Sequence, residues 1–228
     1  MIYKSIKYIS FFIILLLTAC ENNPFAGKLD EGRITYTMKY FEDEGVNPLI
    51  SLLPTEMIIE FKDNSYSQKI EGWMGIFSMA GIYNTKTKTN SALLKIMSDK
   101  FHYETGLDGE SFGFDSLPKM KIEYTNETQV IAGYKCKKAK IIFEDSKIKN
   151  FDVFYTTEIS IAKPNNHNPF NEIKGVLLKY QMGFQDIQME VTATKVEETK
   201  ISDTSFEIPA NYEKVPIEKM QEVLDNLM

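Results

Sequence analysis

Few residues of this chain combine the types and the spacing that catalysis or metal binding requires. Only two histidines occur, His102 in a strand-like run and His167 in a loop rich in asparagine and proline. Neither has a second histidine or a cysteine at metal-ligand spacing, so the sequence predicts no metal site. The acidic cluster at residues 42–44 lies in a polar turn, where solvated carboxylates are commoner than a tuned acid–base pair. No nucleophile elbow, phosphate-binding loop or dinucleotide fingerprint occurs, and we expect a protein that is not an enzyme and needs no cofactor.

Cys20 has the surroundings of a lipidation site. Lys4 and Lys7 precede an apolar run over residues 9–17, which is shorter than the roughly 20 residues that cross a membrane. The sequence up to this cysteine then resembles the bacterial lipobox, in which a peptidase recognises the preceding residues, here Leu17, Thr18 and Ala19. We therefore expect a lipid on Cys20 that makes the membrane a partner. An ordinary signal peptide with an incidental cysteine, or an uncleaved anchor, is the alternative.

This interpretation divides the chain into a signal peptide (1–19), a lipidated tether (20–31) and one antiparallel β domain (32–228). Glu21 is the only acidic residue directly after the cysteine, which fits poorly with the acidic surface-export signal of Bacteroidetes lipoproteins. We expect the outer membrane, with the domain facing the periplasm.

The remaining cysteine and the charge balance exclude other classes. Without Cys20, Cys136 has no disulfide partner, and we expect it to be a buried small apolar residue. The chain has 26 basic and 32 acidic residues, a formal net charge of −6, which removal of residues 1–19 makes more negative. An acidic domain argues against nucleic acid as a partner.

The elements that must position any site are mostly strands. Residues 34–40 alternate between apolar and polar, which predicts a half-buried strand. Residues 56–62 and 66–71 predict a hairpin with a turn at 63–65, and Ile187–Val196 is the cleanest alternating run. About ten short strands of this kind indicate a mainly β protein with a single antiparallel sheet.

Two stretches depart from simple alternation. Residues 134–143 change which face is apolar part-way along, which a β-bulge or sharp twist would reconcile. Residues 72–81 are apolar, rich in glycine, and match neither helical nor strand periodicity. They are either a loop that seals the core or a flexible lining for a ligand cavity, in which case the lining residues are Trp73, Met74, Ile76, Phe77 and Met79.

At the end of the chain, Pro216 at a first helical position and apolar residues at helical spacing up to Leu227 predict a helix that covers the sheet. Earlier, Asp115-Ser116-Leu117 fits the short signal for O-glycosylation in Bacteroidetes, with Ser116 as the acceptor.

Four segments resemble, in order, the DUF4412 family of Bacteroidetes envelope proteins: Gly32–Tyr36, Ile131–Ala139, Ile173–Leu178 and Phe206–Tyr212. The most specific is Ala132-Gly133-Tyr134-Lys135-Cys136, while Val176-Leu177-Leu178 departs from the usual family pattern, which has a proline there. The family is similar in pattern to the LolA, LolB and LppX lipoprotein carriers. The resemblance implies a strongly curved sheet, an incomplete barrel, closed by a few helices over an apolar cavity.

The function implied is a lipid-anchored, non-catalytic module that binds a lipid, or the acyl chain of another lipoprotein, in an apolar cavity. The alternative is a structural lipoprotein that contacts another envelope protein and has no small-molecule ligand. A roomy apolar interior favours the first and a packed interior the second.

Overall fold

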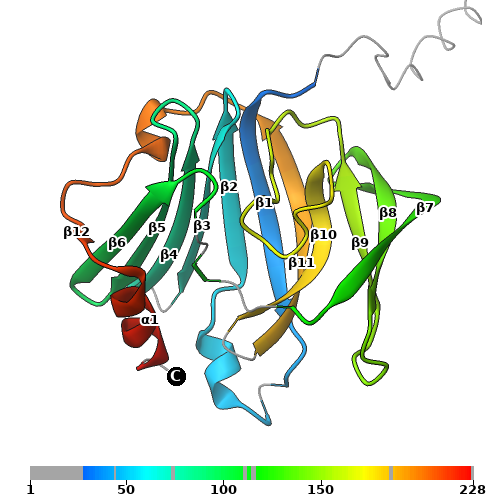
Figure 1. The fold of residues 1–228 in the computed structure, drawn as a ribbon, viewed down its shortest axis with the longest axis horizontal. Helices are drawn as coiled ribbons and strands as arrows, with labels where there is room; N and C mark the ends of the chain where they lie inside the picture. Colours follow the sequence, from blue (N-terminus) through cyan, green and yellow to red (C-terminus); the bar gives the residue numbers. More distant parts are fainter. Residues whose placement is uncertain are drawn as a thin grey trace, which may run out of the picture.

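A computed structural model describes residues 28–43, 45–72, 75–109, 112–113, 117–184 and 187–226. They form one sheet of twelve strands, with one α-helix and two short 3-10 helices (Figure 1). The strands are β1 (Glu31–Tyr40), β2 (Glu56–Lys62), β3 (Ser65–Gly72), β4 (Phe77–Asn84), β5 (Thr89–Ile96), β6 (Asp99–Gly106), β7 (Met120–Ile131), β8 (Tyr134–Phe143), β9 (Phe151–Thr156), β10 (Val176–Phe184), β11 (Ile187–Glu198) and β12 (Glu213–Lys214). The helices are η2 (Pro48–Leu52), η4 (Asp203–Phe206) and α1 (Ile217–Asp225).

The sheet is open, and its strand order is β12-β6-β5-β4-β3-β2-β1-β11-β10-β9-β8-β7. Every pair is antiparallel except β12 with β6, and β1 joins the two runs of consecutive strands by pairing with both β2 and β11. The prediction of a mainly β protein with a single curved antiparallel sheet and a C-terminal helix is therefore confirmed.

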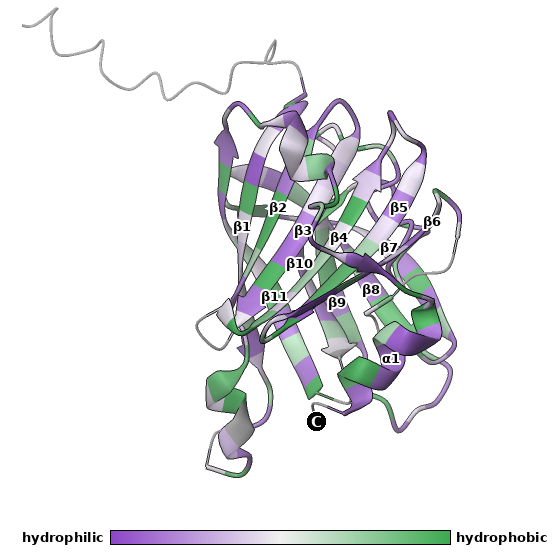
Figure 2. Ribbon diagram, turned by 90° about the vertical axis from the view of Figure 1, so that its left-hand side faces the viewer, coloured by the Kyte–Doolittle hydropathy of each residue, from purple (hydrophilic) through white to green (hydrophobic). Residues whose placement is uncertain are grey.

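Local sequence explains the first strands. In β1, Ile34, Tyr36 and Met38 are buried, as the alternation predicted. Asp63 and Asn64 connect β2 to β3 with positive φ angles of 50° and 65°, the conformation of a two-residue hairpin turn that matches the twist of its strands. Figure 2 shows the alternation of apolar and polar residues along the strands.

The expected irregularity near residues 134–143 is present, but it lies in the partner strand. β7 has a register shift between Tyr124 and Thr128, opposite Lys137–Ala139 of β8. At that point β8 changes from burying its even-numbered residue Cys136 to burying the odd-numbered residues Ala139 and Ile141. Extra residues in β7 thus accommodate the change of face in β8.

Both faces of the sheet are covered in part. The long connection of residues 157–175 lies over the concave face and adds Phe170 and Ile173, both fully buried, to the core cluster that includes residues of β1 and β10. On the convex face, residues 199–212 place Ile201 and Phe206 on Ile82 and Leu93.

The connection between β6 and β7 links strands at opposite sides of the sheet, and its residues Phe112 and Gly113 lie on the concave face. Beside it, α1 buries Met220 and Leu224 against Phe77 and Leu94, which confirms the predicted helix, with Pro216 as its N-cap instead of its first residue. No helix in the described part of the chain has the length and apolar character needed to span a membrane.

Candidate functional site

A cavity lies on the concave face because two very small residues face each other in neighbouring strands. Gly81 of β4 pairs with Ala92 of β5, and the next residues in the same row are Gln68 of β3 and Tyr103 of β6. The row on one side carries Tyr66, Tyr83 and Asn90, and the row on the other carries Ile70, Met79 and Leu94. The larger side chains of these two rows therefore surround a gap in the middle one.

Gly81 marks this gap directly. A β-carbon added to Gly81 would have no atom within 4 Å. The cavity volume is about 130 Å³, and the cavity is partly open to solvent. An engineered apolar cavity of about 150 Å³ binds benzene, so this one has room for about one ring-sized group.

Five of the chain's 11 methionines line the cavity, from strands on both sides of it. They are Met38, Met57, Met79, Met182 and Met189. Methionine is flexible and polarisable, so a wall of methionines adapts to apolar groups of different shape.

Among the lining residues that the structure describes there is no Asp, Glu, Lys or Arg, although a quarter of the residues in the chain are charged. A charged group placed there would lose its hydration without gaining an ionic partner, which is strongly unfavourable. The cavity is therefore suited to a neutral occupant.

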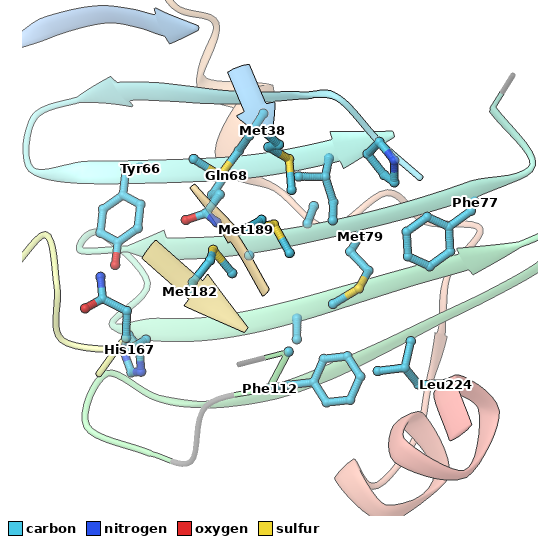
Figure 3. Close-up of a pocket in the computed structure, with 18 of the residues that line it drawn as sticks. Met38, Tyr66, Gln68, Phe77, Met79, Phe112, His167, Met182, Met189 and Leu224 are labelled. Carbon is cyan, nitrogen blue, oxygen red and sulfur yellow. The ribbon is translucent and has the colours of Figure 1, made fainter. Parts of the chain in front are cut away.

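The two ends of the cavity differ in polarity (Figure 3). Phe77, Phe112 and Leu224 lie at one end, whereas Tyr66 and His167 lie at the other, and Gln68 lies between methionines in the middle. An occupant that matches both ends has an apolar body and a hydrogen-bonding group at one side.

His167 belongs to the polar end and comes from the long 157–175 connection. Its Nδ1 lies 3.3 Å from the Asn90 side-chain amide, and its ring centroid is 5.7 Å from that of Tyr83. Burial lowers the pKa of His167, an effect that the nearby Asp108 carboxylate opposes and Lys163 reinforces. The imidazole is therefore neutral at pH 7, in keeping with the rest of the lining.

The apolar end is covered by the segment that crosses from β6 to β7. Phe112 contacts the cluster formed by Phe77 and Leu94, and a β-carbon on Gly113 would lie 2.7 Å from the methyl carbon of Met79. Gly113 also has a φ of +91°, which favours glycine. The backbone conformation is the stronger reason for glycine at position 113, because the flexible end of Met79 can move away from an added β-carbon.

Of the predicted lining residues, Phe77 and Met79 do line the cavity. Ile76 is 45% exposed and does not contribute to the cavity wall. Trp73 and Met74 lie outside the described residues, as do the predicted lipidation residue Cys20, its recognition residues Leu17, Thr18 and Ala19, and Ser116.

Sequence patterns alone did not identify most of the cavity residues. Those not identified include the paired small residues Gly81 and Ala92 and the polar end around His167. The available signal was the glycine inside the run Phe77–Tyr83, where alternate residues are otherwise large. Its significance depends on the pairing with Ala92, which the linear sequence does not reveal.

Other chemically active residues lie outside this cavity. Burial raises the pKa of the Cys136 thiol to about 11, so the thiol is protonated and a poor nucleophile. Among the described residues no group of three His, Cys, Asp or Glu side chains is arranged to hold a metal ion. His102, expected to be at the surface or hydrogen-bonded, instead has a buried Nδ1 without a partner in the described part of the chain.

Comparison with known protein families gives a match over the second half of the chain. Residues 110–220 match the family model described as N-glycanase peptide, N-terminal domain, of the PNGase F-II type. The matched segment is just under half of the chain and runs from before β7 into α1, so it includes the 157–175 connection and Met182, Met189 and His167 of the cavity. A comparison with curated protein sequences found no match.

The resemblance to the DUF4412 family is therefore wrong. Three of its four segments, Ile131–Ala139, Ile173–Leu178 and Phe206–Tyr212, lie within the part of the chain that matches the N-glycanase domain. These segments are mostly short strand and turn sequences, which unrelated β proteins share.

The same match overturns the two functions expected from the sequence. These were a carrier of lipid or acyl chains and a structural lipoprotein without a ligand. The geometry gives a physical reason in the first case. A space of about 130 Å³ holds a ring-sized group, which is much smaller than the acyl chains of a lipoprotein.

Proposed function

We propose that this protein is a non-catalytic binding module whose concave cavity takes one neutral, largely apolar side chain of a polypeptide. The observation that carries the proposal is the uncharged, methionine-lined space beside Gly81 and Ala92. It is large enough for one side chain and below the roughly 300 Å³ at which drug-sized pockets begin.

Two further observations support a polypeptide as the partner. The family matched by residues 110–220 is named for an N-glycanase peptide, and a glycosylated polypeptide is the class of target that this name suggests. Methionine-rich walls also occur in proteins that accept many different peptide side chains.

The size of the site sets the expected strength of binding. Burying one apolar side chain contributes about 1.5–3 kcal/mol, which alone gives only millimolar affinity or weaker. We therefore expect weak, reversible recognition of exposed apolar residues, with additional affinity only from contacts outside the cavity.

The test uses capped pentapeptides that have one variable residue between glycines, with binding to the full-length chain followed by ligand-observed NMR. Leucine, methionine, phenylalanine and tyrosine at the central position should give clear saturation transfer, whereas lysine and glutamate should give at least tenfold less. Equal signals from charged and apolar peptides would contradict the proposal.

A matched pair of variants connects this binding to the cavity. Gly81→Met places a side chain in the cavity, while Gly106→Met makes the same change at a glycine that also has open space but lies at the exposed end of β6. The first variant should lose the peptide signal and the second should retain it. Retention of binding in both would place the site elsewhere.

For location, we propose that Cys20 carries a lipid that holds the domain at the periplasmic face of the outer membrane. The support is the sequence from Leu17 to Cys20 alone. Replacing Cys20 with Ala should abolish incorporation of labelled fatty acid and release the domain from membranes, and a variant that stayed membrane-bound and labelled would refute this.

A further inference from the structure

We propose that the concave cavity selects a phenol ring, which in a polypeptide is the side chain of tyrosine, over a ring without a hydroxyl group. This inference rests on the proposed function and goes further by naming the side chain that is bound. It follows from two hydroxyl groups at the polar end of the cavity.

Tyr66 and Tyr83 are deeply buried, with 9% and 3% of their surfaces exposed, and both line the cavity. Neither hydroxyl group makes a hydrogen bond to a residue that the structure describes, and neither oxygen is among the fully buried atoms without a partner, so both are accessible to water. By contrast, the hydroxyl groups of Tyr36 and Tyr40 donate to backbone carbonyls, those of Leu177 and Pro54.

Hydrogen-bonding groups in an interior are normally paired, because an unmet buried donor or acceptor is destabilising by about 1–3 kcal/mol. Both tyrosines line the cavity, so an apolar occupant that displaces water from it leaves their hydroxyl groups without a partner. The hydrogen-bonding capacity that the protein leaves unused is therefore available to whatever fills the cavity.

The two tyrosines form one unit. Their rings are stacked, with centroids 5.2 Å apart and an angle of 15° between the planes, because Tyr66 and Tyr83 pair directly across β3 and β4. Gly81 lies two residues from Tyr83 on the same face of β4, about 7 Å along the strand. A ring in the space beside Gly81 therefore lies next to the Tyr66–Tyr83 pair.

A phenol ring matches the rest of the cavity as well. Its six-carbon body fits a space of about 130 Å³, and methionine sulfurs such as those of Met79 and Met189 pack well against aromatic rings. Its hydroxyl group is neutral at pH 7, since tyrosine ionises only near pH 10. It both donates and accepts a hydrogen bond, as the two tyrosine hydroxyl groups do.

The test compares p-cresol with toluene, the same ring with and without the hydroxyl group, by calorimetric titration of the full-length chain. We expect p-cresol to bind about tenfold more tightly, the difference made by one well-formed hydrogen bond to an otherwise unpaired buried group. In Tyr66→Phe/Tyr83→Phe this preference should fall to about twofold or less, while toluene still binds.

Tyr124→Phe is the matched control. Tyr124 lies on β7 outside the cavity, and its hydroxyl group donates to the carbonyl of Glu172. This variant should keep the tenfold preference. If wild-type protein binds toluene as tightly as p-cresol, or if the double variant keeps the preference, the inference is wrong.

The pentapeptides separate this inference from the proposed function. Binding of the tyrosine peptide with a clear advantage over the phenylalanine peptide supports both. Equal binding of the two peptides overturns the inference and leaves the proposed function intact. A p-cresol preference without binding of any peptide overturns the proposed function, because the cavity then takes free phenols instead of a polypeptide side chain.

Discussion

The concave face of the sheet has a plugged half and a hollow half, and both are built on strands with the same alternation. In the plugged half, Phe170 from the long connection packs edge-on against Phe151 and Tyr180, with ring centroids 6.2 Å and 6.1 Å apart, and Tyr36 packs edge-on against Tyr180. In the hollow half, the corresponding inward positions are occupied by Gly81 and Ala92. The difference shows that the cavity arises from side-chain volume, with no break in the sheet.

The methionines lie around the hollow. Met38, Met182 and Met189 come from β1, β10 and β11, the strands that also carry the plugged half, while Met57 and Met79 come from the other side. These flexible side chains form a boundary that can adjust when the hollow is filled, whereas Phe170 is fully buried and packs against the buried ring of Tyr180.

The largest expected effect comes from removing one large side chain from each half. Phe170→Ala deletes a fully buried ring and should lower the free energy of unfolding by about 4 kcal/mol. The loss for Phe77→Ala should be smaller by about 1 kcal/mol or more, because Phe77 borders an existing cavity and has fewer atoms around it. Urea unfolding of both variants checks this, and equal losses would mean that the two halves are equally packed.

Enlarging a side chain should be destabilising in the plugged half and stabilising in the hollow half. Ala139→Leu inserts a larger side chain at a fully buried position of the plugged half and should be destabilising by about 1–3 kcal/mol. Gly81→Ala should be stabilising by about 0.5–1 kcal/mol, since its β-carbon meets no atom and the unfolded chain loses freedom. Destabilisation by Gly81→Ala would show that the space beside this residue is already filled.

The smallest effect concerns pH and belongs to the hollow half alone. Because burial lowers the pKa of His167, the unfolded chain binds more protons than the folded protein between that lowered pKa and the ordinary value near 6.5. Stability should therefore be unaffected by His167 above pH 7 and should decrease as pH falls through this window.

The urea midpoint measured from pH 7.5 to pH 5.5 should show a slight decline that His167→Gln removes. Carboxylates whose pKa is lowered by lysine partners, such as Glu31 and Asp203, titrate at lower pH and do not interfere. An identical decline in the variant would assign it to other groups.

The sequence predicted the fold better than the site, for a physical reason. The alternation of Ile34, Tyr36 and Met38, the turn at Asp63 and Asn64, and the apolar face of α1 are local patterns, and the structure confirms each of them. They are sufficient to establish a single antiparallel sheet with a C-terminal helix.

The cavity depends on contacts between distant residues. The space opens because Gly81 pairs with Ala92, and the neighbouring half is filled because Phe170 reaches it from a long connection. Neither the register of two strands nor the path of a connection is encoded in periodicity. Phe77 and Met79 were predicted as lining because their segment was apolar, while Gly81 and His167 were missed because they carry no such signal.

The most direct test of the binding cavity uses its own methionines as reporters. The chain is labelled with ¹³C at the methionine methyl groups and titrated with the capped pentapeptide that has tyrosine at its centre. The prediction is that the methyl signals of Met38, Met57, Met79, Met182 and Met189 shift together, while those of Met97, which is 72% exposed, and of Met120 remain in place. Unchanged signals from the five cavity methionines at millimolar peptide, or shifts confined to Met97 and Met120, would contradict the account.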